Sequence, residues 1–223
     1  MHTEKRNNQA PPIPKDVPKA VVSRLSLYLR ELQHLLRAGK ATVSSHQLGR
    51  LLGFTDAQVR KDLTYFGHFG HPGIGYRCEE LAVAIRRILG TDRLWTVGLV
   101  GVGNLGRALL GYRGFAAKGF RIVAAFDADA RKTNTAVDGI QVYGLDQLQE
   151  VIERHRIQLA MLTVPATAAQ SVAELVAAAG VTGIVNFAPV TLSLPEEISL
   201  VGVDLATELE QISFSVANRL ASR

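Results

Sequence analysis

The sequence predicts an α/β fold in two parts, an N-terminal winged helix-turn-helix domain followed by a doubly wound parallel sheet. Two short capped helices joined by a tight glycine turn predict the first part. From residue 91 onward, short apolar runs alternate with amphipathic segments, which is typical of parallel strands connected by helices. The expected division is a polar arm (1–16), the winged helix (17–90), the sheet domain (91–204) and a C-terminal helix (205–223).

The composition of the chain favours a globular protein without a membrane-spanning segment or a disulfide. With 47% hydrophobic and 20% charged residues, the 223-residue chain resembles an ordinary globular protein. It has no apolar run of membrane-spanning length and no hydrophobic signal at its N-terminus, so we expect a cytoplasmic protein that avoids membranes. The single cysteine, Cys78, excludes an intrachain disulfide and fits a reducing compartment.

The positive charge is concentrated in the first part of the chain. Residues 1–90 hold 14 Lys and Arg against 7 Asp and Glu, whereas residues 91–223 hold 11 against 13. This asymmetry favours an anionic polymer as the partner of the first part alone. The charge distribution alone does not exclude chance clustering of basic residues. The sequence motifs therefore have to decide whether the first part binds an anionic polymer.

The N-terminal elements follow from periodicity and capping residues. Three prolines predict a disordered arm over residues 1–16, and an apolar stripe predicts a helix over residues 18–38. Ser44 is the expected cap of a helix at 45–52, with Gln47 as its capping-box partner. Thr55 is the expected cap of a helix at 56–66, again with a glutamine, Gln58, three residues on.

A glycine-rich segment, GHFGHPGIGY at residues 67–76, follows these helices and predicts a β-hairpin wing. A last amphipathic helix at about residues 79–89 completes the domain. In a helix-turn-helix, the outward face of the second helix enters the major groove of DNA. The sequence therefore predicts a double-stranded DNA partner for this domain.

The candidate DNA contacts come from the two helices and the wing. Arg60 and Lys61 are the best candidates for base or phosphate contact, because arginine with guanine is the commonest specific pair. Hydroxyl groups and backbone amides at the start of the helix at 45–52 are also candidates, because such groups commonly bind phosphate. For a single pair such as Arg60 and Lys61, a solvated helical face is the more common explanation, and only the whole arrangement favours DNA. The further candidates are Ser44, Ser45, Gln58 and Thr64 on the helices, and His71 and Gly73 on the wing.

The second part alternates strands and helices. Strands are expected at residues 95–100, 121–126, 141–143, 158–162, 183–186 and 200–203. Helices are expected at 104–117, 145–154 and 166–178, with a final helix at 204–220.

The loop after the first of these strands matches G-x-G-x-x-G, the fingerprint of a Rossmann-type dinucleotide site. Gly101 would make the tight turn, Gly103 would leave room for the phosphates, and Gly106 would let helix and strand pack closely. The predicted loop consists of Gly101, Val102, Gly103, Asn104, Leu105 and Gly106.

Asp127 lies 21 residues past Gly106, at the end of the second strand, where a carboxylate accepts hydrogen bonds from the adenine ribose. Such a carboxylate repels a 2′-phosphate and favours NAD(H) over NADP(H), although Arg131 and Lys132 are near enough to be phosphate partners. A domain that has lost its cofactor or binds another nucleotide is the alternative. Strand ends line the crevice of this fold, so the expected neighbours of the nicotinamide half are Thr163, Val164, Pro165, Asn186 and Phe187.

The string QVRKDLTYFGHFGHPGIGY, followed by GLVGVGNLG, AAFD, LTVPA, NFAP and VDLATELE, resembles the redox-sensing transcriptional repressor Rex family. The resemblance covers nearly the whole chain, from about residue 17 to 220. It implies a homodimer that represses genes when NAD⁺ dominates and leaves its palindromic operator when NADH binds. It also implies C-terminal helices exchanged between subunits, and switch residues at Arg30, Tyr112 and Asp204. Asp204 has an independent rationale as the N-cap of the last helix, whereas Tyr112 could equally be a partly buried helix residue.

The wing departs from the family pattern, which usually reads G-K-R-G-hydrophobic-G-Y. Here a histidine and a proline, His71 and Pro72, stand where the family has two basic residues. Up to two phosphate contacts are removed, and each should lower the magnitude of the salt slope by roughly 0.9. The departure puts the operator affinity of the wing in doubt.

The C-terminal helix is apolar on more than one side, since Phe214, Ala206 and Ala217 lie off its main stripe. Burial between two surfaces explains such a pattern and suits an exchanged dimer arm. A helix packed on its own domain is the alternative. The main stripe consists of Leu205, Leu209, Ile212, Val216 and Leu220.

Two further classes of function compete with the repressor. An NAD-dependent oxidoreductase with a basic accessory domain would need an acid or base group beside the cofactor. The part of the chain after residue 90 holds one histidine, His155, in a charged segment, and no Tyr-x-x-x-Lys pair. We therefore expect no catalytic residues and no metal site. A nucleotide-binding assembly factor whose basic part binds protein is disfavoured by the wing.

Overall fold

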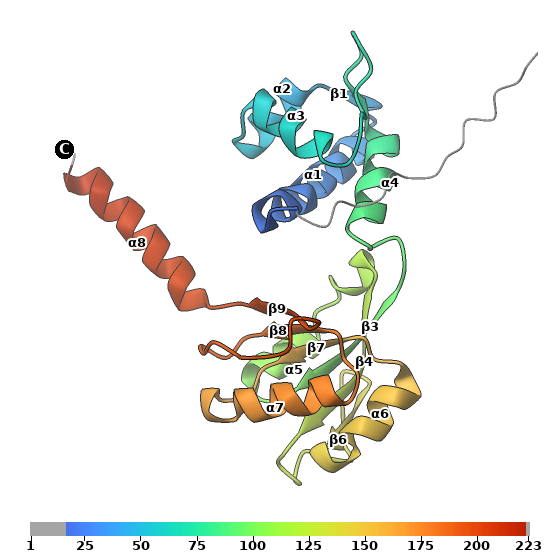
Figure 1. The fold of residues 1–223 in the computed structure, drawn as a ribbon, viewed down its shortest axis with the longest axis vertical. Helices are drawn as coiled ribbons and strands as arrows, with labels where there is room; N and C mark the ends of the chain where they lie inside the picture. Colours follow the sequence, from blue (N-terminus) through green and yellow to red (C-terminus); the bar gives the residue numbers. More distant parts are fainter. Residues whose placement is uncertain (1–16, 222–223) are drawn as a thin grey trace, which may run out of the picture. The chain divides into compact units, whose positions relative to one another are not determined.

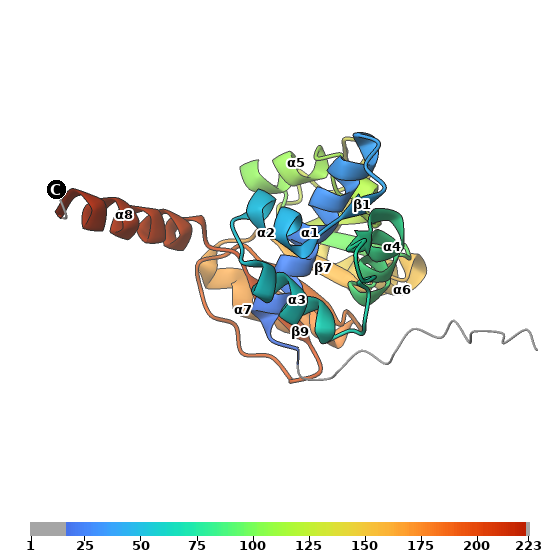
Figure 2. The ribbon, with the colours of Figure 1, turned by 90° about the horizontal axis from the view of Figure 1, so that it is seen from above.

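The structure is a computed structural model that describes residues 17–221. The arm predicted for residues 1–16 lies outside this range. The chain consists of two compact units that meet between Arg93 and Leu94 in the sequence, and Figures 1 and 2 show the elements of both. No helix among residues 17–221 is long and apolar enough to cross a membrane.

In its described part, residues 17–93, the first unit contains four helices and a two-stranded sheet. Its core takes side chains from every helix, including the fully buried Leu25, Leu48, Leu63 and Ile85. The elements are α1 (Lys19–Arg37), β1 (Thr42–Val43), α2 (Ser45–Leu52), α3 (Asp56–Thr64), β2 (Tyr76–Arg77) and α4 (Cys78–Ile88).

Both short helices begin at the expected caps. Ser44 Oγ accepts from the Gln47 backbone N–H at 3.1 Å, and the Gln47 side chain accepts from the Ser44 backbone N–H at 2.9 Å. These two bonds form the predicted capping box. Thr55 Oγ1 caps α3 through the Gln58 backbone N–H at 3.1 Å. A second capping box is absent, however, because the Gln58 side chain turns to Asp62 instead.

The turn between these helices requires glycine at two places. Gly53 ends α2 with a φ of 75°, in the left-handed region where side chains are strained. A Cβ on Gly49 would lie 2.6 Å from the Phe54 carbonyl oxygen, so α2 and the start of the next segment meet closely. The tight glycine turn of the prediction is confirmed.

The wing is paired differently from the expected simple hairpin. Its returning strand β2 pairs with β1, in the register Val43 to Tyr76. Within the wing itself, one bridge joins His71 and Gly75 through N–H···O contacts of 2.7 and 3.0 Å. A Cβ on Gly75 would lie 2.6 Å from the Val43 carbonyl oxygen. The base of the wing is thus held by β1, a strand that precedes α2.

The second unit contains a seven-stranded sheet in the order β5-β6-β4-β3-β7-β8-β9. Every neighbouring pair is parallel except β5 with β6. The chain leaves β3 for β4 on one side and later returns to β7 on the other, so β3 marks the switch point of a doubly wound sheet. The predicted fold class is confirmed. The strands are β3 (Trp95–Val100), β4 (Phe120–Asp127), β5 (Ala136–Val137), β6 (Ile140–Gly144), β7 (Leu159–Leu162), β8 (Gly183–Asn186) and β9 (Ser199–Gly202).

Helices cover both faces of this sheet (Figure 1). One apolar cluster joins the sheet to α6 (Leu148–His155) and α7 (Ala166–Ala178). A second cluster, on the other face, includes side chains of α5 (Asn104–Leu110). The expected helix at 104–117 is too long: α5 ends at Leu110, and a 3₁₀ turn (Ala116–Lys118) follows. Glycines at 111 and 114 explain the break, because glycine is a poor helix former.

The last helix, α8 (Leu205–Ala221), follows β9 and has no buried side chain. Asp204 caps it, since its carboxylate accepts from the Ala206 backbone N–H at 2.9 Å. Leu205, Leu209 and Phe214 are 68, 67 and 69% exposed. The apolar faces of α8 are therefore uncovered by the described chain.

Candidate nucleotide site and nucleic-acid interface

The glycine loop lies at the carboxyl end of β3 and opens α5. Gly101 has a φ of 100°, and a Cβ there would lie 2.7 Å from the Thr163 carbonyl oxygen. A Cβ on Gly106 would overlap the carbonyl oxygen of Gly101. At Gly103, by contrast, nothing lies within 4 Å of a Cβ position. The loop is closed against the sheet and open toward solvent, which is the geometry that fits a dinucleotide pyrophosphate.

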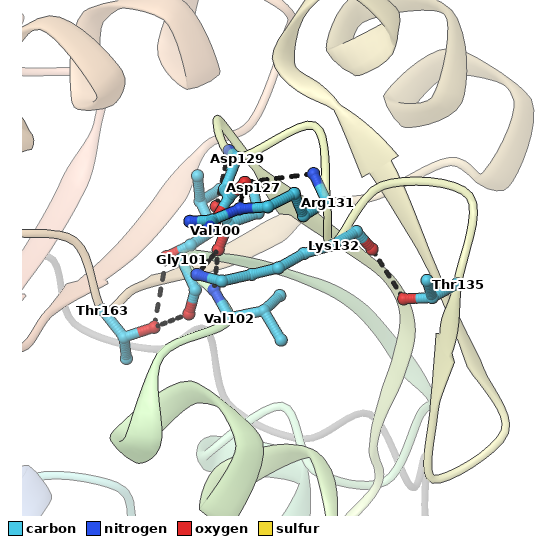
Figure 3. A network of polar contacts seen from close by, with 9 residues as sticks. All are labelled: Val100, Gly101, Val102, Asp127, Asp129, Arg131, Lys132, Thr135 and Thr163. Atoms are coloured by element: carbon cyan, nitrogen blue, oxygen red, sulfur yellow. Dashed lines mark hydrogen bonds and ion pairs between the residues drawn. The ribbon is translucent and has the colours of Figure 1, made fainter.

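Asp127 stands at the end of β4 and is bound to the glycine loop (Figure 3). Its Oδ2 accepts from the Val102 backbone N–H at 2.7 Å, and its Oδ1 accepts from the Asp129 backbone N–H at 2.8 Å. Lys132 Nζ donates to Oδ2 at 3.0 Å. Burial would raise the pKa of this carboxyl, but the donated hydrogen bonds outweigh it and lower the pKa. The side chain is an anion held in a fixed orientation.

The two cations that follow Asp127 behave differently. Arg131 is 90% exposed and forms two hydrogen bonds with the Asp129 carboxylate, at 2.9 and 3.0 Å. These bonds lower the pKa of Asp129 to about 2. Lys132 is 31% exposed and reaches back to Asp127. The sequence offers both residues as phosphate partners. In the structure, Lys132 contacts the Asp127 carboxylate, whereas Arg131 lies in solvent.

Thr163 follows β7 and binds the glycine loop. Its hydroxyl lies 2.6 Å from the Gly101 carbonyl oxygen and 3.2 Å from the Val100 carbonyl oxygen (Figure 3). This contact fixes the loop against the neighbouring strand. Val164 is partly buried and Pro165 is exposed, so the segment after β7 borders the loop. On the loop itself, Asn104 is exposed and Leu105 is 43% exposed.

Asn186, which the sequence offers as a neighbour of the nicotinamide half, ends β8 with its side chain buried, at 2% exposure. Its amide nitrogen donates to the carbonyl oxygens of Ala188 and Val190, and its oxygen accepts from the Ala188 backbone N–H, all at 3.0 Å. The side chain thus shapes the loop after β8, and both of its amide hydrogens are used there. Phe187 beside it is partly buried and packs on the core under α5.

The outward side chains of α3 are linked to α2. Arg60 Nη1 donates to Ser45 Oγ at 3.1 Å and pairs with Asp56 at 2.7 Å, and all three groups are accessible. Lys61 is exposed. The Thr64 hydroxyl donates to the Arg60 carbonyl oxygen at 2.7 Å. These residues form one accessible face from two helices, and Ser44 borders it through the cap of α2.

Gln58 also differs from its expected outward role. Its side-chain amide donates to Asp62 Oδ1 at 2.7 Å, and the residue is partly buried. One amide hydrogen is therefore used inside the unit. The side chain supports α3 from within and is a weaker candidate for DNA contact than Arg60 or Lys61.

Asp62 is a buried carboxylate that sequence reasoning missed. It is 0% exposed and accepts from Arg24 Nε at 2.6 Å, Arg24 Nη2 at 2.8 Å and the Tyr28 hydroxyl at 2.7 Å, besides Gln58. These bonds join α1 to α3. Burial opposes ionisation, yet the hydrogen bonds keep the pKa of Asp62 lowered. The signal was present, because position 62 lies beside Val59 and Leu63 on the inward side of α3.

The tip of the wing is accessible. Gly73 has a φ of 74° and no atom within 4 Å of its Cβ position. His71 is exposed, and its Nε2 lies 3.8 Å from a carboxylate oxygen of Glu80. Arg77 Nη1 contacts the other oxygen of Glu80 at 3.1 Å. A carboxylate at the wing thus faces the position where the related pattern has a basic residue.

The three switch positions lie on both units. Arg30 is exposed on α1. Tyr112 follows α5, is 57% exposed, and packs edge-on against Phe115 with ring centroids 4.9 Å apart. Its ring covers Gly114, where a Cβ would overlap it. Asp204 caps α8 and lines a cavity of about 360 Å³ together with Pro189.

Comparison with known proteins follows the same division of the chain. Residues 16–64 match the family described as "Putative DNA-binding protein N-terminus", and residues 92–190 match the CoA binding domain family. A redox-sensing transcriptional repressor Rex of Desulfitobacterium hafniense is 45% identical over 205 residues, which are 92% of this chain and 98% of the relative. The Rex of Rhodopirellula baltica is 46% identical over 198 residues, 89% of this chain and 84% of the relative.

Solved structures of a Rex-family repressor named RSP match most of the chain. RSP in complex with beta-NAD⁺ and operator DNA is 33% identical, has a TM-score of 0.88 and is matched over 93% of this chain and 96% of its own. RSP in complex with beta-NADH is 31% identical with a TM-score of 0.84, over 93 and 98% of the two chains. The identities and the coverage leave one conclusion: this chain belongs to the redox-sensing transcriptional repressor Rex family.

Proposed function

We propose that this chain is a transcriptional repressor that binds operator DNA when NAD⁺ dominates and releases it when NADH binds. The observation that carries the proposal is the glycine loop, closed at Gly101 and Gly106, open at Gly103, with the Asp127 carboxylate fixed beside it. A loop of this geometry holds a pyrophosphate and its neighbouring carboxylate holds a ribose. The family name states a regulator, and we therefore assign the site to sensing and not to hydride transfer.

The proposed nucleotide is NAD(H). The glycine loop would surround the pyrophosphate, Asp127 would accept from the adenine ribose, and the segments after β7 and β8 would border the nicotinamide. Bound NADH or NAD⁺ supplies a ring that differs in charge between its two redox forms. The residues of the site would orient that ring and convert its difference in charge into a difference in DNA binding. No residue of the site therefore needs to transfer a proton.

The proposed DNA-binding face consists of α3, the start of α2 and the wing. Arg60 and Lys61 would contact bases or phosphates, and Ser44, Ser45 and Thr64 would contact the backbone. The accessible Arg60–Ser45 contact supports this, since it brings both helices of the motif to one surface. His71 and Gly73 would place the wing near the minor groove. We also propose domains at 17–90 and 91–204, with residues 205–223 as the dimerisation segment.

We propose a homodimer in which α8 packs against the partner subunit. The support is its exposure: Leu205, Leu209, Ile212 and Leu220 are each at least 60% exposed, and none is covered by the described chain. An uncovered apolar helix of 17 residues is costly in water unless a second chain covers it. A two-fold dimer presents two DNA-binding units and so selects a palindromic operator. A cytoplasmic location follows from the proposed partners, DNA and NAD(H).

The proposed switch is a population shift between two dimer arrangements that space their DNA-binding units differently. NADH must bind the arrangement that does not fit the operator more tightly, because a ligand with equal affinity for both shifts nothing. Arg30, Tyr112 and Asp204 are the proposed switch residues. The exposure of Arg30 and Tyr112 supports this, because both are accessible to groups outside their own unit.

The test is gel retardation of a palindromic operator while NADH and NAD⁺ are titrated separately. We expect NADH to release the DNA and NAD⁺ to leave it bound. Retention that neither nucleotide changes would refute the sensor. Asp127→Ala should weaken the response to NADH and leave DNA binding intact, whereas loss of DNA binding would contradict the division of labour. Turnover of hydroxy acids or alcohols with NAD⁺ would instead support an oxidoreductase.

A further inference from the structure

The carboxylate of Asp127 has too few free positions to hold a ribose diol alone. A carboxylate offers about four acceptor positions, two on each oxygen. Among the described residues, Val102 N–H and Lys132 Nζ occupy both positions on Oδ2, and Asp129 N–H occupies one on Oδ1. One position remains, whereas the 2′ and 3′ hydroxyls of a ribose bring two donors. The second hydroxyl needs another partner.

Lys132 is the partner that the structure provides. Its ammonium group has three hydrogens, and one of them is directed at Asp127 at 3.0 Å. The other two are available to oxygen atoms that approach the carboxylate. At 31% exposure, the side chain lies along the loop and not in bulk solvent. Figure 3 shows Lys132 and Asp127 reaching toward each other beside the glycine loop.

The loop that carries Lys132 is fixed by its own hydrogen bonds. The Lys132 backbone N–H donates to the Asp129 carbonyl oxygen at 2.9 Å. The Lys132 carbonyl oxygen accepts from the Thr135 hydroxyl at 2.6 Å. Arg131, the neighbouring cation, is held away by Asp129 and is 90% exposed. The direction of Lys132 toward the carboxylate is therefore a property of the folded loop.

We propose that Lys132 is a specificity-determining residue of the nucleotide site, which with Asp127 forms a paired ribose site. Asp127 accepts from one hydroxyl and Lys132 donates to the other. This inference rests on the proposed NAD(H) site and deepens it. It has a consequence for nucleotide choice. Asp127 alone repels a 2′-phosphate, but the Lys132 ammonium offsets that repulsion and offers donors to the phosphate oxygens. Lys132 thus sets how strongly the site discriminates against NADPH.

The test compares the affinities of the full-length protein for NADH and NADPH, measured by fluorescence titration of each nucleotide. Lys132→Met keeps an unbranched side chain of nearly the same length and removes its charge. We expect NADPH affinity to fall by about tenfold or more, as for a lost hydrogen bond to a charged group, and NADH affinity to fall by about threefold at most. Arg131→Met is the matched control and should leave both affinities unchanged.

Lys132→Arg provides the rescue, since it retains the cation and should keep NADPH affinity within about threefold of the wild type. Thermal unfolding of each variant verifies that the unit is folded. Equal loss of both nucleotides in Lys132→Met, or no loss of either, would overturn the inference, as would a wild-type protein that excludes NADPH even at millimolar concentration. A wild type that binds no NADH would overturn the proposed function itself, which is a separate outcome.

Discussion

Removal of Asp62 should loosen α1 and α3 while it leaves the second unit intact. Asp62→Ala takes away the acceptor of four hydrogen bonds, two from Arg24 and one each from Tyr28 and Gln58. The Tyr28 hydroxyl would remain buried without its acceptor, which costs about 1–3 kcal/mol. The Arg24 side chain is 21% exposed and would recover some hydration. Breaking a fully buried pair costs about 3–5 kcal/mol, so we expect about 3 kcal/mol in total.

Hydrogen exchange measured by mass spectrometry localises this loss. A decrease of about 3 kcal/mol in the opening free energy of a helix corresponds to an increase of about a hundredfold in exchange rate. We expect this increase for amides of α1 and α3, whose link the variant removes. Peptides from the sheet of the second unit serve as the internal control. Asp62→Asn is the matched variant, because it keeps one acceptor oxygen and should show a smaller increase.

The result would refute our reasoning if α1 and α3 exchanged within about threefold of the wild type. Such an outcome would mean that the network contributes little net free energy, because desolvation of the two charges cancels their attraction. An increase confined to α3 would also contradict it. The hydrogen bonds join two helices, and both must lose protection together.

Three further predictions follow from the same geometry. Gly106→Ala should lower NADH affinity by about tenfold or more in a fluorescence titration, without loss of operator binding. The reason is that the added Cβ would overlap the Gly101 carbonyl oxygen and displace the loop. Unchanged NADH affinity would show that the loop does not hold the nucleotide. Leu209→Glu should halve the mass seen by sedimentation velocity at micromolar concentration, whereas Glu210→Gln on the same helix should not; a dimer that persists would mean that α8 does not carry the interface. The lowered pKa of Asp62 should stabilise the first unit above the unfolded pKa of about 4, and this contribution should be lost as pH falls through the folded pKa. Urea unfolding of wild type and Asp62→Asn at a series of pH values should show a stability difference between the two that shrinks as the pH falls below about 4; a difference that does not change with pH would contradict it.

Local signals in the sequence predicted most of the fold. Strands β3 and β8 and helices α2 and α7 have the predicted bounds, because apolar runs and capping residues define them within a few positions. The predicted end of α5 was wrong because the prediction continued the helix past Gly111 and Gly114, whereas α5 ends at Leu110. The edge strand β5 was missed because its two residues, Ala136 and Val137, carry no pattern and pair only through tertiary contact.

The sites were harder to predict than the fold, because a sequence position does not reveal where a side chain's hydrogen bonds go. Asn186 falls at a strand end, as ligand-binding residues do, yet its side-chain hydrogen bonds go to the following loop. Gln58 falls at a capping-box position, yet it serves Asp62. Lys132 was one of two neighbouring cations, and only the path of the loop decides which of them reaches Asp127.

Asp62 and Asp127 are both buried carboxylates, and their hydrogen bonds explain why only Asp127 is proposed to bind a ligand. Both are at most 8% exposed and both have a lowered pKa. The four acceptor positions of Asp62 are matched by four donors within the first unit. It can take no ligand, and its charge is balanced by Arg24, so phosphates that approach the outer face of α3 do not meet an uncompensated anion. Asp127 has three donors and one open position beside a loop that is itself open at Gly103. The fourth position can accept a hydrogen bond from a hydroxyl group, and this is the physical reason to propose the ribose there.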